Sequence, residues 1–154
     1  MPEPTPVWMV HLMQGMTPQE VAGTLRLEDE VVAFESDASG DRFTLRLDEL
    51  TRVKRLRASP VLLIRWARDG TPRQTAFYFA PPPPLEPQPR TVAQDLSPVS
   101  PLGALARPTK RRHRRRNSIY LSTAAGELKP TLVAWASALQ DQMTASRGRG
   151  EPQA

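Results

Sequence analysis

One stretch decides the fold of this chain, residues 128–143, which read LKPTLVAWASALQDQM. Within it, large apolar side chains recur at spacings of four, three, four and four residues. These side chains are Leu128, Leu132, Trp135, Leu139 and Met143. Residues at such spacings share one face of an α-helix. The stretch therefore predicts a single amphipathic helix that buries a central tryptophan.

Further upstream, residues 21–80 predict strands with no helix among them. Leu25 and Leu27 alternate with the charged Arg26 and Glu28, which is the period of a half-buried strand. Turn residues separate the alternating segments, for example DASGD at 37–41. About six strands are expected, near 21–28, 32–34, 43–47, 50–56, 61–66 and 74–79. Because short turns join consecutive strands, the pattern predicts an antiparallel meander.

The flanking segments have weaker patterns. Residues 1–20 are an ambiguous leader: Trp8, Val10 and Leu12 alternate as in a strand, whereas Trp8, Leu12 and Met16 share a helical face. Prolines at 81–84 end the sheet, because proline lacks the N–H that a strand donates. Residues 81–116 show no period and predict a disordered insert rich in proline and arginine.

After the insert, residues 117–146 are expected to complete the same domain with a last strand at 117–123 and the C-terminal helix. Residues 147–154 predict a flexible tail. The fold class is therefore mainly β with one C-terminal α-helix. We expect an antiparallel, partly open barrel of about seven strands that the helix plugs.

Four pieces of the chain point to a known fold. They are GTLRL at 23–27 with VAF at 32–34, FTLRLDEL at 43–50, LLIRW at 62–66 with FYF at 77–79, and the tryptophan of the closing helix. These pieces resemble the pleckstrin-homology (PH) superfold, and more closely its bacterial PH-like and GRAM-like relatives. The resemblance implies a binding module. Lipid-binding PH domains place Lys and Arg in the first hairpin loop, where this chain has Glu28, Asp29 and Glu30, so a standard phosphoinositide pocket is not expected.

Positive charge is concentrated in one stretch. The chain has a net charge of +5, residues 1–80 carry −1 and residues 81–154 carry +6. Seven basic residues lie within 107–116, which we call the basic run: Arg107, Lys110, Arg111, Arg112, Arg114, Arg115 and Arg116. Near an anionic bilayer each contributes about 1 kcal/mol, and on nucleic acid the run would release counterions. A solubilising linker is the remaining interpretation.

Two further candidates are weaker. Arg52, Lys54, Arg55 and Arg57 form a second basic patch on one predicted strand, where charge also protects a sheet edge. Ser118 follows two arginines and is a candidate phosphorylation site, unless it only begins a strand. A phosphate there would weaken the hold of the basic run on an anionic partner.

Little in the sequence indicates catalysis. The chain has no cysteine, and its two histidines, His11 and His113, have no visible partner. We therefore expect no enzyme, no cofactor and no metal site. The expected function is a binding module that docks on a protein partner or an anionic membrane surface, and the alternative is non-specific RNA or DNA binding. We expect a cytoplasmic location, peripheral to the inner membrane, without a transmembrane segment.

Overall fold

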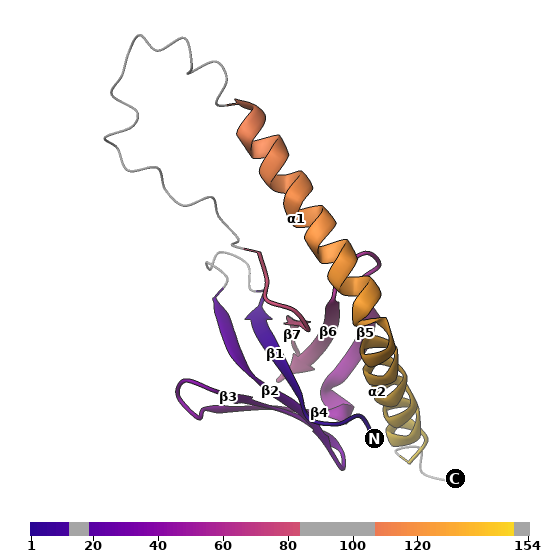
Figure 1. Cartoon of the computed structure of the whole chain (residues 1–154). Coiled ribbons are helices and arrows are strands. Elements are labelled where there is room, and N and C mark those ends of the chain that lie inside the picture. Colours follow the sequence, from indigo (N-terminus) through magenta and orange to yellow (C-terminus); the bar gives the residue numbers. More distant parts are fainter. Residues whose placement is uncertain (13–18, 84–106, 150–154) are drawn as a thin grey trace.

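The computed structural model describes residues 1–12, 19–83 and 107–149, with the backbone alone for 107–116 (Figure 1). Two helices follow seven strands in chain order, with one short 3₁₀ turn, η1, between the fourth and fifth strands. The strands are β1 Thr5–His11, β2 Glu20–Glu28, β3 Val31–Ser36, β4 Arg42–Arg46, β5 Leu50–Arg55, β6 Val61–Arg68 and β7 Thr71–Tyr78. The other elements are η1 Leu47–Glu49, α1 Arg107–Glu127 and α2 Lys129–Arg149.

The strands form one antiparallel sheet in the order β4-β3-β2-β1-β7-β6-β5. The six strands predicted within residues 21–80 are all present, and β2 buries the face that its alternation predicts. On β2, Leu25 and Leu27 are buried while Arg26 and Glu28 are exposed. The mainly β fold class is thus confirmed.

The sheet is curled, so that strands far apart in its order meet across the interior. Phe34 of β3 lies 6.2 Å from Phe77 of β7, measured between ring centroids. Phe43 of β4 lies 5.8 Å from Trp66 of β6. One cluster of buried side chains includes residues from all seven strands and α2. A flat sheet of this order could not bring these rings together, because at least two other strands separate each pair.

The sheet does not close, and α2 covers the opening. The edge strands β4 and β5 are joined by η1 but are not paired with each other. Helix α2 packs against β5, η1 and β6, which places it across this gap. Its Leu132, Trp135, Leu139 and Met143 are buried, as predicted. Burying such side chains contributes about 1.5–3 kcal/mol each.

Trp135 is the centre of this contact. Its side chain is fully buried, and its ring meets Phe79 edge-on at 6.3 Å. The indole Nε1 donates a hydrogen bond of 3.0 Å to Oγ1 of Thr5 on β1. A buried indole N–H needs such a partner, because leaving it unpaired costs free energy. The closing helix is therefore held by apolar packing and by a polar contact to the opposite side of the interior.

Helix α1 precedes α2 almost without interruption. Pro130 has no N–H for the carbonyl of Gly126 four residues earlier, which explains a break at the junction. Helical hydrogen bonds are still formed on both sides of Pro130, since Leu128 N donates to Ala124 O and Leu132 N donates to Leu128 O. Figure 1 shows the result: α2 lies along β5, and α1 extends beyond the sheet.

Two predictions about this part of the chain are wrong. Residues 117–123 are not a strand but part of α1, and 107–116 are not disordered but form the first half of the same helix. The seventh strand comes instead from the leader, since β1 pairs with both β2 and β7. Arginine, leucine and alanine favour helix. Because α1 continues into α2, it also avoids much of the unfavourable nucleation step of a separate helix. The remainder of the predicted insert, 84–106, lies outside the described residues.

Two smaller corrections concern the predicted tail and the first hairpin. Helix α2 continues to Arg149, where Nη1 forms a 3.1 Å ion pair with Glu30, so 147–149 are not a flexible tail; residues 150–154 lie outside the described residues. The acidic corner 28–30 lies in the β2–β3 turn, the second hairpin rather than the first. Its charges therefore say nothing about the β1–β2 loop.

Candidate functional site

The basic run occupies the first half of α1, the part farthest from α2 along the helix. The second half connects it to the body. There Ala124 is buried, and the Tyr120 hydroxyl donates a 3.0 Å hydrogen bond to the carbonyl of Pro81, just after β7. Ile119, one residue before Tyr120, is 58% exposed. Within the α1 side chains that the structure describes, those of 117–127, Ala124 and Tyr120 thus connect the helix to the body.

The second basic patch does not form one surface. Arg52 and Lys54 are exposed on β5, with Arg52 opposite Arg65 and Lys54 opposite Leu63 of β6. These four residues line a groove of about 60 Å³, the outer groove. Arg55 is half-buried, and Arg57 lies beyond β5 in the turn to β6. The alternation of a strand explains the division, because Lys54 and Arg55 point to opposite faces.

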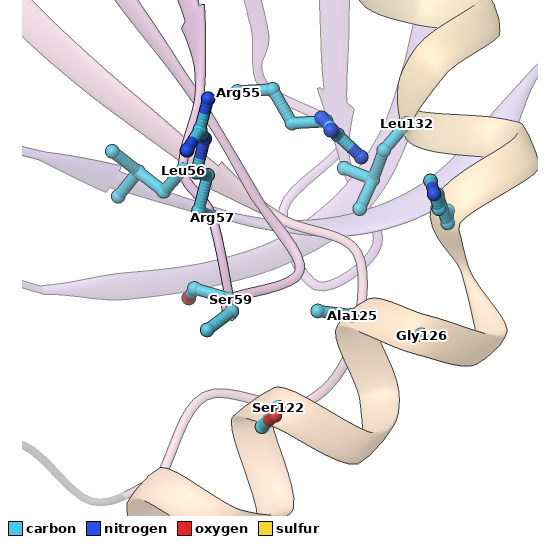
Figure 2. A pocket seen from close by; sticks show the side chains of 10 residues that line it. Arg55, Leu56, Arg57, Ser59, Ser122, Ala125, Gly126 and Leu132 are labelled. Carbon is cyan, nitrogen blue, oxygen red and sulfur yellow. The ribbon is translucent and has the colours of Figure 1, made fainter.

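Arg55 and Arg57 line a larger pocket, the junction pocket, of about 420 Å³. It lies between the β5–β6 turn and the place where α1 meets α2. Ala58 and Ser59 continue the rim from the turn, and Leu132 contributes from α2. Figure 2 shows Arg55 reaching from β5 toward Leu132, with Ser59 on the β5–β6 turn and Ser122 on α1.

The charge of the junction pocket is uniformly positive. Its lining includes three cations, Arg55, Arg57 and Lys129, and no acidic side chain of the described chain lies among the lining residues. The four ion pairs within the described residues involve none of these cations. Two serine hydroxyls, of Ser59 and Ser122, also line it. Guanidinium, ammonium and hydroxyl groups can all donate hydrogen bonds to an oxyanion.

Elsewhere the acidic side chains near the sheet edge have basic partners. Glu28 accepts a 2.6 Å hydrogen bond from Arg42. Glu49 accepts two from Arg68, at 2.7 and 2.9 Å, and one from the backbone N–H of Arg46. The bonds from Arg68 are the main reason why the pKa of Glu49 falls to about 2. These ion pairs stabilise η1 and the hairpins. The junction pocket differs, because its cations form none of the ion pairs of the described residues.

Ser118 lies on α1, one position after Asn117, and is exposed. It does not begin a strand, so that alternative interpretation is wrong. The hydroxyl is accessible on a helix immediately after the basic run.

His11 has a structural environment. Its Nδ1 lies 3.0 Å from Oγ1 of the buried Thr75, which also accepts a 3.0 Å hydrogen bond from Trp66 Nε1. Its ring meets Phe43 edge-on at 4.8 Å. Burial, and then the charge of Arg73, lower the pKa of His11. Among the described residues, no His, Asp and Glu side chains form a group of three that could hold a metal ion.

Sequence reasoning missed Ser59, Ser122 and Lys129. They come from a turn, from α1 and from α2, and only the fold brings them beside Arg55 and Arg57. Lys129 carried a weak signal, because it is one of only three lysines and directly follows the first apolar position of the closing helix.

No protein-family model matches this chain, and no curated protein matches it significantly. No helix that the structure describes combines the length and apolar character needed to cross a membrane.

Proposed function

We propose that this protein is a non-enzymatic, PH-like binding module that docks on an anionic surface, of a membrane or of an acidic protein partner, with the basic run as its electrostatic tether. One observation carries the proposal: seven basic residues occupy the start of a helix that extends beyond the sheet. The folded body, near neutral in charge, holds this helix through α2.

The order of the elements supports the PH-like part of the proposal. Strands β1 to β4 pair in sequence, β5 to β7 pair in sequence, and β1 joins the two groups by pairing with β7. The C-terminal helix α2 then covers the opening between the edge strands. This arrangement agrees with the fold that the resemblance implies.

The basic run is a poor helix start unless anions are near. Four pairs of like charges lie four residues apart, Arg107 with Arg111, Lys110 with Arg114, Arg111 with Arg115, and Arg112 with Arg116. Each such pair costs about 0.2–0.5 kcal/mol, or roughly 1–2 kcal/mol in total. No acidic residue lies in the first turn to offset the helix dipole. An anionic surface would remove both penalties, so the helix is electrostatically matched to such a partner.

Vesicle co-sedimentation tests the tether. The wild-type chain should bind phosphatidylcholine vesicles that contain phosphatidylglycerol, should not bind phosphatidylcholine alone, and should dissociate as salt is raised. A variant with Arg111, Arg112, Arg114 and Arg115 changed to Gln should bind about a hundredfold or more weakly, since each charge contributes about 1 kcal/mol. Gln keeps the helix propensity of the segment.

A matched control removes the same number of charges elsewhere, with Arg26, Arg52, Lys54 and Arg65 changed to Gln. This variant has the same net charge as the first and should keep most of the binding. Equal losses in the two variants would show that net charge alone governs the interaction and would overturn the proposed tether.

RNA or DNA binding is the second candidate, because a basic helix that extends from a body has the width to enter the major groove of DNA. A gel shift with RNA and with DNA, over the same salt series, separates the two. Nucleic-acid binding tighter than vesicle binding, and lost in the same Gln variant, would favour this second function.

A further inference from the structure

We infer that the junction pocket binds a phosphomonoester group, either as the headgroup of a membrane lipid or on a free small molecule. The inference deepens the proposed docking function by giving the anionic partner a defined chemical group and a second point of contact. It assigns a role to residues outside the basic run.

The cations of the pocket come from separate elements. Arg55 ends β5, Arg57 lies in the β5–β6 turn, and Lys129 begins α2. Like charges that line one pocket repel one another, and solvent weakens this repulsion less at the half-buried Arg55 than at the exposed Arg57 and Lys129. Since none of the three forms an ion pair with a described residue, a bound anion would supply the missing counter-charge.

The donor set suits phosphate better than carboxylate. Guanidinium groups match two oxygens of a phosphate at once, and an ammonium adds a compact positive charge. Ser59 and Ser122 line the pocket from the turn and from α1, so hydroxyl groups are available beside the cations (Figure 2). A phosphomonoester has three terminal oxygens and close to two negative charges, so it can use more of these donors than a phosphodiester or a carboxylate can.

The pocket has room for such a group. Its volume of about 420 Å³ is within the range of small-molecule sites, roughly 300–1,000 Å³. The wall formed by α1 consists of small residues, Ser122, Ala125 and Gly126. A Cβ atom added at Gly126 would meet nothing within 4 Å. Space and charge therefore coincide at this junction.

The position of the pocket relative to the basic run favours joint binding. The last turns of α1 line the pocket, and its first half carries the run. From Arg112 to Ser122 is ten residues, about 15 Å of helix at 1.5 Å per residue. A surface that engages the run would thus lie close to the pocket, and the second contact would form at high effective concentration.

Two probes with the same phosphomonoester test the inference with the full-length chain. Glycerol 3-phosphate is measured by calorimetry, and phosphatidic acid in phosphatidylcholine vesicles by co-sedimentation. Phosphatidylglycerol vesicles of matched surface charge supply the phosphodiester comparison. We expect the wild-type chain to prefer phosphatidic acid over phosphatidylglycerol.

Two kinds of variant should abolish this preference. The double substitution Arg57→Ser with Lys129→Ser removes two cations from the pocket, with a loss of about fivefold per cation in phosphatidic acid binding. Arg26→Ser with Lys54→Ser removes the same two types of charge outside it and should keep the preference. Gly126→Glu adds a carboxylate where space is open and should abolish the preference, whereas Gly126→Gln, of equal size, should preserve most of it.

The outcomes separate this inference from the proposed function. Pocket-dependent binding of glycerol 3-phosphate indicates a free ligand as a source, and pocket-dependent binding of phosphatidic acid alone indicates a lipid headgroup; both support the inference. Equal binding of the two vesicle types, unchanged by the pocket variants, overturns the pocket and leaves the basic run intact. Binding of glycerol 3-phosphate without any vesicle binding would support the pocket and contradict membrane docking.

Discussion

Helices α1 and α2 follow one another along the chain and have the same length, 21 residues each, yet they are held in different ways. Helix α2 buries Leu132, Trp135, Leu139 and Met143 against the sheet. In the part of α1 whose side chains are described, Ala124 alone is buried. The difference teaches that an apolar face fixes α2, whereas the described side chains of α1 add little more than Ala124 and the Tyr120 hydrogen bond to its continuity with α2. The segment that packs on the sheet and the segment proposed to bind an anionic surface are therefore neighbours in the chain but differ in packing.

The largest effect on stability should come from the packed helix. Trp135→Ala removes the fully buried indole and should lower the free energy of unfolding by about 3–5 kcal/mol, because a cavity remains in the interior. Urea denaturation followed by circular dichroism measures this change. Val133→Ala on the same helix is the control. Because the Val133 side chain is 45% exposed, this change should cost less than about 1 kcal/mol. Equal losses would contradict the assignment of the buried face.

A smaller effect should follow when the polar contact of α2 is removed. Thr5→Val keeps the shape of the side chain but removes the acceptor of the Trp135 Nε1 hydrogen bond. The unpaired indole N–H should cost about 1–3 kcal/mol. The same denaturation experiment measures it. In the Trp135→Phe background, which has no N–H to satisfy, Thr5→Val should have little further effect.

The contribution of Glu49 on η1 to the stability of the fold should depend on pH. Glu49→Gln breaks the ion pair that joins η1 to β6 and should cost about 1 kcal/mol at neutral pH, since the pair is partly exposed. The pKa of Glu49 lies at about 2, below its ordinary value of 4.5. The contribution is therefore complete above about pH 4.5 and is lost as the pH falls toward 2. Urea denaturation of the wild-type chain and of Glu49→Gln, near pH 7 and near pH 2, should show a difference in the free energy of unfolding at the higher pH alone.

The smallest effect is expected from a substitution on α1, at Ser118. It should change binding to vesicles without changing the free energy of unfolding. Ser118→Glu places a negative charge after the basic run and should weaken binding to phosphatidylglycerol vesicles by about fivefold. Its unfolding should match that of the wild-type chain, because Ser118 is exposed. Ser118→Ala should leave both properties unchanged. Unaltered binding of the Glu variant would remove the case for regulation at this position.

The elements predicted from sequence are those with an apolar period that matches one packed face. Leu25 and Leu27 on β2, and the four buried side chains of α2, kept their predicted faces because the core contacts them directly. Strand β1 was ambiguous because Trp8 and Leu12 fit both periods. Its pairing with β2 and β7, a tertiary contact, decided in favour of strand.

The first helix and the junction pocket could not be predicted for a related reason. Residues 107–123 contain few apolar side chains, so no period marked them as helical, and Ile119 with Leu121 imitated a strand. The helix of α1 is supported by its continuity with α2, which the local pattern does not record. In the same way, Arg57 and Lys129 are 72 positions apart in the chain and line one pocket only after folding.

Hydrogen–deuterium exchange of the full-length chain, with and without phosphatidylglycerol vesicles, tests the division between the two helices most directly. We predict that the amides of α2 are protected in both conditions, whereas those of the basic run exchange about tenfold more slowly when vesicles are present, in line with the relief of like-charge repulsion. Unchanged exchange in the basic run, or a change confined to α2, would contradict the account.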